Sequence, residues 1–134
     1  MSVYQSDQQL YDVMGTAWER AFGDATVREK FIGLQIYVQF KIHEPAAELW
    51  LLSDATVHRG AFAGTPDKPV VSMEMKADVA HRFWQDRLNV PLATAKGEIK
   101  AKGPVTKIFG LIPLVKPVKA LYPGLCAQHH IAEG

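Results

Sequence analysis

The sequence predicts an α+β domain in which a five-stranded, mostly antiparallel sheet is covered on one face by helices. Residues 34–43 alternate apolar and polar side chains, which is typical of a strand with one buried face and one solvated face. Residues 7–22 and 78–88 instead repeat apolar side chains every three or four positions, as amphipathic helices do. Strand-like and helix-like segments are also grouped along the chain, which argues against a doubly wound parallel sheet.

The first helix is predicted over residues 7–22. Ser6 is placed to cap its amino end, with Gln9 three residues later as in a capping box. Gly23 is placed to end the helix in a left-handed conformation. Asp24 is then suited to cap a second, shorter helix. We therefore expect two helices before the first strand.

Turn residues divide the middle of the chain into four strands, a helix and a fifth strand. Pro, Gly and Asp cluster between the third and fourth strands and mark the longest loop. In the fourth strand, Met73 and Met75 face inward because strand side chains alternate between the two faces. We expect the strands to follow one another as a meander over residues 34–43, 48–52, 56–63, 70–75 and 97–103, with helices at 78–88 and 91–96.

Residues 105–121 form an apolar segment near the carboxyl end. Pro113 and Pro117 each remove a backbone donor and crowd the preceding turn, so we expect two short helical pieces with a bend. One interpretation is a terminal helix docked on the sheet. A second, compatible interpretation is a lid over a cavity mouth that makes transient contact with a membrane surface, where its lysines meet anionic headgroups. These lysines are Lys107, Lys116 and Lys119.

Composition and charge exclude several classes of protein. A chain of 134 residues fits one domain over residues 1–134, and a formal net charge of +1 gives no basic footprint for a nucleic acid. The amino-terminal residues show no secretory signal, and no uninterrupted apolar run reaches the length of a membrane span. Cys126 is the only cysteine, which excludes an internal disulfide and suits a reducing compartment. We expect a cytoplasmic protein.

The residues that commonly carry metal or nucleophilic chemistry do not form a recognisable motif. A structural zinc site needs four ligands, usually as two spaced pairs, and only one group of candidates lies close together. That group is Cys126, His129 and His130, whereas His43, His58 and His81 are scattered. No nucleophile elbow or phosphate-binding loop is present. We therefore expect no catalytic residue, no metal and no cofactor.

The stretch LNVPLATAKGEIKAKG, residues 88–103, carries a further pattern. It contains the small residues Ala93 and Ala95, then Gly97, a short strand with Lys100 in its middle, and Gly103. This pattern, lying after four strands and a helix, resembles the sterol carrier protein family, in particular the lipid-transfer domain of the type-two sterol carrier protein. Two departures from the family are Lys68-Pro69 at the entry to the fourth strand and Pro104 after the second glycine.

The resemblance implies an apolar tunnel between the sheet and its helices that holds a sterol, a fatty acid or an acyl-CoA, with no catalytic residue set. We therefore expect non-catalytic binding and transfer of an apolar ligand driven by hydrophobic burial. The expected wall residues follow from the side chains that should point inward and from the family resemblance. They are Leu34, Ile36, Val38, Trp50, Met73, Met75, Phe83, Leu88, Ile99, Phe109 and Ile112.

Two other functions stay open. The chain could be an accessory or interaction subunit of a lipid or acyl-CoA pathway enzyme, binding a partner or forming a homodimer. It could also be a small enzyme similar to ketosteroid isomerase, which would need a carboxylate or a Tyr with a shifted pKa inside the cavity. Tyr37 and Asp54 are the candidates for that role, and Tyr37 falls on the polar face of its strand.

Overall fold

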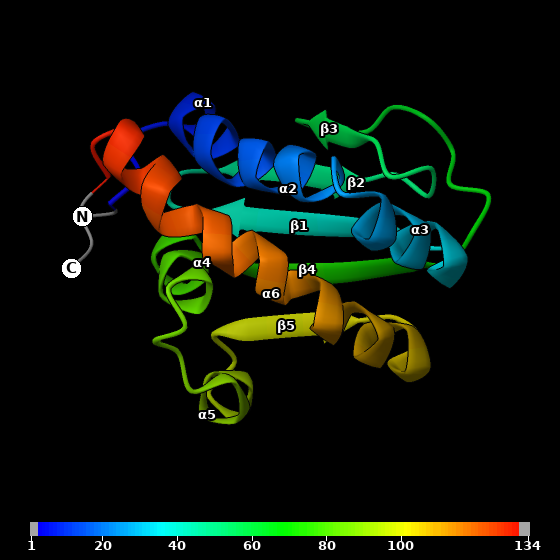
Figure 1. The fold of residues 1–134 in the computed structure, drawn as a ribbon. Helices are drawn as coiled ribbons and strands as arrows, with labels where there is room; N and C mark the ends of the chain where they lie inside the picture. Colours follow the sequence, from blue (N-terminus) through cyan, green and yellow to red (C-terminus); the bar gives the residue numbers. More distant parts are fainter. Residues whose placement is uncertain (1–2, 132–134) are drawn as a thin grey trace.

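The computed structural model describes residues 3–131, which form a five-stranded sheet with helices packed on one of its faces (Figure 1). This arrangement confirms the predicted α+β fold class. The strands are β1 (Tyr37–His43), β2 (Ala47–Leu51), β3 (Val57–Arg59), β4 (Val70–Lys76) and β5 (Ile99–Lys102). The helices are α1 (Asp7–Leu10), η1 (Tyr11–Gly15), α2 (Thr16–Ala21), α3 (Ala25–Leu34), α4 (Ala77–Trp84), α5 (Val90–Ala95) and α6 (Val105–Gln128).

The strand order in the sheet is β3-β2-β1-β4-β5, with β1 and β4 parallel and the other neighbours antiparallel. The predicted meander is therefore wrong in one connection, because β4 pairs with β1 and not with β3. Residues 60–69 carry the chain from one edge of the sheet to the far side of β1. A parallel pair needs a long connection of this kind, since a tight turn joins only antiparallel strands.

The register aligns the residues that face the helices. Phe40 lies opposite Leu49 on β2 and Met73 on β4, and Met73 lies opposite Ala101 on β5. Because side chains alternate between the faces of a sheet, this row forms a continuous apolar floor across four strands.

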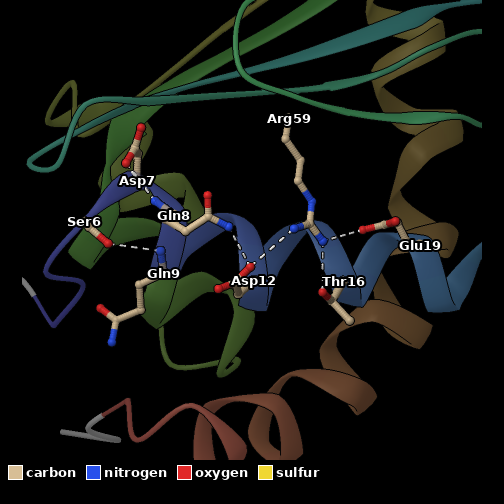
Figure 2. Close-up of polar contacts among 8 residues, drawn as sticks. All are labelled: Ser6, Asp7, Gln8, Gln9, Asp12, Thr16, Glu19 and Arg59. Carbon is tan, nitrogen blue, oxygen red and sulfur yellow. Dashed lines mark hydrogen bonds and ion pairs between the residues drawn. The ribbon is translucent and has the colours of Figure 1, made fainter.

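The segments α1, η1 and α2 follow one another without a break and form one helix with a π-helical turn in its middle. The predicted capping by Ser6 is confirmed, since the backbone N–H of Gln9 donates to Ser6 Oγ at 3.1 Å (Figure 2). Gly23 does not end the helix in a left-handed conformation; its N–H donates to the Arg20 carbonyl instead. Asp24 caps α3, as predicted, by accepting from two backbone N–H groups.

Arg59 joins the edge strand β3 to the amino-terminal helix. Its guanidinium donates to Asp12 at 3.3 Å, to Thr16 at 3.1 Å and to Glu19 at 2.7 Å (Figure 2). Gly15 leaves room for this side chain, because a Cβ there would lie 3.1 Å from Arg59 Nε. These contacts hold the helix against the sheet at the end opposite β5.

α6 is one 24-residue helix and not the two predicted pieces, although Pro113, Pro117 and Pro123 lie inside it. Each proline leaves the carbonyl four residues earlier without its helical partner. Two of these carbonyls belong to Phe109 and Pro113, which are exposed, so water can satisfy them without a break in the helix. α6 runs as a curved element across the helical face of the sheet (Figure 1).

By length and composition alone α6 could cross a membrane, although its lysines and prolines interrupt the apolar run in the sequence. Its inner side packs on α2, α3 and α4. The side chains buried there are Leu111, Leu114, Val118, Tyr122, Leu125 and Cys126. Burial of one long side is typical of a helix that covers a globular core.

Candidate functional site

A cavity of about 260 Å³ lies between the helical face of the sheet and the helices above it. The sheet side of the lining comprises Phe40, Ile42, Leu49, Met73, Met75, Ile99 and Ala101. The helical side comprises Leu10, Met14, Trp18, Ala80, Phe83, Trp84, Val90, Thr94, Ile108, Leu111, Ile112 and Val115. One apolar space thus lies among four strands (β1, β2, β4 and β5), the amino-terminal segments α1, η1 and α2, and the helices α4, α5 and α6.

The spacing of the lining residues along each helix and strand places their side chains on the side that faces the cavity. Leu10, Met14 and Trp18 are spaced four residues apart and lie on one side of the amino-terminal helix. In the sheet, Met73 and Met75 are two residues apart and share the inner face of β4. The same alternation that separates core from solvent therefore also directs side chains into the cavity.

The cavity lining carries little chemistry. Within residues 3–131 no Asp, Glu, His, Lys, Arg, Cys or Tyr lines this space. The hydroxyl of Thr94 already donates to the Val90 carbonyl at 2.8 Å. Among the described residues, Trp18 Nε1 is the one buried side-chain nitrogen or oxygen without a hydrogen-bond partner. Such a space is suited to hydrophobic burial of a ligand and offers no group for proton transfer.

A second, polar recess of about 310 Å³ adjoins the cavity at Met75. Its charged groups are already largely paired: His43 binds Glu74 at 2.7 Å, and the hydrogen bond lowers the pKa of the Glu74 carboxyl. Glu98 pairs with Arg82 at 3.3 Å. The apolar cavity is therefore the better candidate for a ligand site.

The structure brings together five of the predicted wall residues and places six elsewhere. Those lining the cavity are Met73, Met75, Phe83, Ile99 and Ile112. Those outside its lining are Leu34, Ile36, Val38, Trp50, Leu88 and Phe109. Contact between the first group and a ligand stays a prediction.

Three of the residues outside the lining lie at the start of the predicted first strand. Leu34 ends α3 and packs across α6 at Gly110, where a Cβ would lie 2.5 Å from Leu34 Cδ2. Ile36 precedes β1 and is fully buried in the core. Val38 lines a small neighbouring hollow of about 40 Å³.

The other three lie outside the lining for different reasons. Trp50 lies on the far face of the sheet, where its ring packs 5.4 Å from that of Phe62 and its Nε1 donates to Glu48. Leu88 follows the end of α4 and packs, partly buried, against the core. Phe109 points outward from α6 and is 64% exposed.

The contribution of the amino-terminal helix to the cavity lining was not predicted from the sequence. Leu10, Met14 and Trp18 were recognisable as part of its apolar face, but that pattern does not separate residues facing a hollow from residues packed against other side chains. Phe40 and Ile42 could have been included, because they share the inner face of β1 with Val38.

A buried polar cluster fastens α6 beside the cavity. The hydroxyl of Tyr122 on α6 is bonded to the hydroxyl of Tyr4 and, at 2.6 Å, to Nδ1 of His81 on α4. All three residues are buried. Burial raises the pKa of Tyr4 and of Tyr122 above the usual tyrosine range, so both phenols stay protonated. We call these three residues the tyrosine cluster.

The sheet order and the one-sided helical cover match the SCP2-like fold, that is, the fold of sterol carrier protein 2, as two solved structures show. No family model and no curated protein matches the chain. Among solved structures, the sterol carrier protein domain 2 of Helicoverpa armigera matches with a TM-score of 0.65 and 18% identity, over 90% of this chain and 95% of that one. Sterol carrier protein 2 of Yarrowia lipolytica in its apo form matches with a TM-score of 0.58 and 14% identity, over 82% of this chain and 89% of that one. The predicted resemblance is confirmed for the fold.

Proposed function

We propose that this protein binds an apolar lipid reversibly and without catalysis in the cavity beneath α6. The observation that carries the proposal is the cavity of about 260 Å³ whose lining lacks titratable side chains over residues 3–131. The two similar structures are both named sterol carrier proteins, which supports a lipid as the class of ligand.

The size of the cavity suits part of a lipid. It exceeds the roughly 150 Å³ of an apolar cavity that holds benzene and approaches the lower end, about 300 Å³, of common ligand pockets. Met73 and Phe83 line both the cavity and the neighbouring hollow of about 40 Å³. Rotation of these side chains would join the two spaces, and methionine adapts readily to such changes. A fatty acyl chain, free or as acyl-CoA, or a sterol-like lipid are the ligands we propose.

Hydrophobic burial supplies enough free energy for a carrier. Burying about ten methylene groups contributes roughly 8 kcal/mol before the cost of association is subtracted. Association and ordering cost several kcal/mol, which leaves binding in roughly the micromolar range. Binding of this strength retains a ligand but still permits its release.

The proposal is tested by titration with a fluorescent fatty acid and by mass spectrometry of lipids that co-purify with the protein. Ala80→Phe places a ring in the cavity from the inner side of α4, where Ala80 is buried, and is expected to lower the affinity about tenfold, because the ring displaces ligand methylenes. Ala95→Phe is the matched control, since Ala95 is exposed on α5 and does not line the cavity. Wild-type protein that binds no fatty acid and retains no lipid would contradict the proposal.

The observations do not favour the enzyme alternative. Tyr37 lies on the far face of the sheet, where its hydroxyl donates to Asp67 at 3.0 Å. Asp54 lies in an exposed turn and accepts from the Thr56 N–H at 3.0 Å. Neither residue lines the cavity, so neither is placed to move a proton of a bound ligand.

A further inference from the structure

Large exposed apolar side chains gather on α5 and the first half of α6. On α6, Val105 is 63% exposed, Phe109 64% and Ile112 57%; on α5, Leu92 is 50% exposed. A group of large exposed apolar side chains on a globular protein often marks an interaction site.

The exposed residues of α6 lie on one side of the helix. Val105, Phe109, Ile112 and Lys116 follow one another at steps of four, three and four residues, which places them in a single row. We call this row the outer stripe of α6. It lies opposite the buried side that includes Leu111 and packs over the core.

The outer stripe borders the cavity. Ile112 both lines the cavity and is more than half exposed, and Val90 on α5 lines it while being 39% exposed. A ligand that passes between these two side chains therefore leaves the protein next to the stripe.

The charge around the stripe is positive. From residue 99 to residue 131 the sequence has five lysines and no Asp or Glu. Lys119 binds Asp86 at 3.1 Å and lies 4.6 Å from the centre of the Phe83 ring. Lys116, which belongs to the stripe, forms no ion pair with any residue of the part of the chain that the structure describes.

We propose that the outer stripe of α6 docks on the surface of an anionic lipid bilayer. Phe109 and its apolar neighbours enter the boundary between headgroups and acyl chains, and Lys116 on the same side of the helix meets anionic headgroups. The positive charge beside exposed apolar groups matches such a surface. Docking rests on the proposed function for its purpose, since it brings the cavity mouth to the bilayer, but it needs no ligand in the cavity.

Co-sedimentation with vesicles tests the docking directly. Wild-type protein is expected to bind vesicles of phosphatidylcholine and phosphatidylserine more tightly than vesicles of phosphatidylcholine alone, with the difference reduced by salt. Phe109→Ser is expected to lower the affinity about tenfold, since it removes a large inserted side chain. Lys116→Glu is expected to lower it by a similar factor on anionic vesicles only. Ile32→Ser is the control, because Ile32 is 42% exposed on α3 and lies outside the stripe.

Fatty-acid titration of the same variants separates docking from ligand binding. Phe109→Ser should bind a fluorescent fatty acid like the wild type, because Phe109 does not line the cavity. Vesicle binding without fatty-acid binding would reject the proposed function and leave the docking intact. Docking is overturned if the wild type does not sediment with anionic vesicles, or if Ile32→Ser loses as much affinity as Phe109→Ser. A dimer that Phe109→Ser dissociates, without vesicle binding, would assign the stripe to a second copy instead.

Discussion

Gly103 and Gly97 flank the last strand and need glycine for different reasons. Gly103 has a φ of +135°, and a Cβ there would lie 2.9 Å from the Val70 carbonyl oxygen and 3.1 Å from Val71 Cα. Gly97 has a φ of +77°, but a Cβ there would meet nothing within 4 Å. Gly103 thus permits close contact between β5 and β4, whereas Gly97 only permits a left-handed turn.

Alanine substitutions should separate these two roles. Gly97→Ala is expected to lower the free energy of unfolding by about 1 kcal/mol, the cost of a left-handed residue with a Cβ. Gly103→Ala should lower the free energy of unfolding by about 3 kcal/mol, because the new Cβ would clash with backbone atoms of β4 that cannot move away. Urea denaturation of both variants measures the difference, and equal losses would contradict this account.

At the scale of elements, α6 depends on the tyrosine cluster for its attachment. Tyr122→Phe removes the hydroxyl that joins Tyr4 on one side and His81 on the other. Loss of a buried hydrogen-bond partner is expected to lower the free energy of unfolding by about 1–3 kcal/mol. Tyr37→Phe is a matched control, since the Tyr37 hydroxyl bonds to an exposed carboxylate and its loss should cost less than about 1 kcal/mol. Thermal unfolding of the two variants provides the test.

The same cluster predicts how stability depends on alkaline pH. Burial raises the pKa of Tyr4 and Tyr122 in the folded state above the ordinary value of about 10, so the folded protein holds protons that the unfolded chain releases. Their contribution to stability is therefore complete below a pH of about 10 and falls as the pH rises above it. Tyrosinate absorbance should show two of the four tyrosines ionising only as the protein unfolds. Ionisation of all four before any loss of helical circular dichroism would contradict the prediction.

α6 also shows why the positions of prolines did not predict the ends of this helix. The rule that proline ends a helix assumes that the freed carbonyl lacks another partner. In α6, the carbonyls of Phe109 and Pro113 belong to exposed residues, so the helix continues. Which side of the helix faces solvent depends on packing against α2, α3 and α4, and this contact is absent from the local sequence.

For the molecule as a whole, alternation and helical periodicity were enough to predict the fold class but only part of the cavity wall. A period of two identifies Met73 and Met75 as inward-facing, and both line the cavity. Trp50 was misplaced because the far face of the sheet is also covered locally, by Phe62 from the loop between β3 and β4. Leu34 was misplaced because the alternating pattern continues into α3, past Gln35 and its left-handed φ of 52°. The position of Trp50 thus depends on a contact with another segment, and that of Leu34 on a helix end that the alternating pattern does not reveal.

The parallel pairing of β1 with β4 has a consequence for the order of folding. β1 can pair with β2 as soon as the turn between them closes. The other edge of β1 pairs with β4, which is synthesised more than thirty residues later. The hydrogen bond from Ser72 to Gln39, for example, joins residues that are 33 positions apart. Closing the larger loop costs more chain entropy, so that half of the sheet assembles more slowly. Met73 and Ile99 belong to that half. During synthesis the β1 edge is therefore open to pairing with other chains until β4 arrives, and the cavity is completed last.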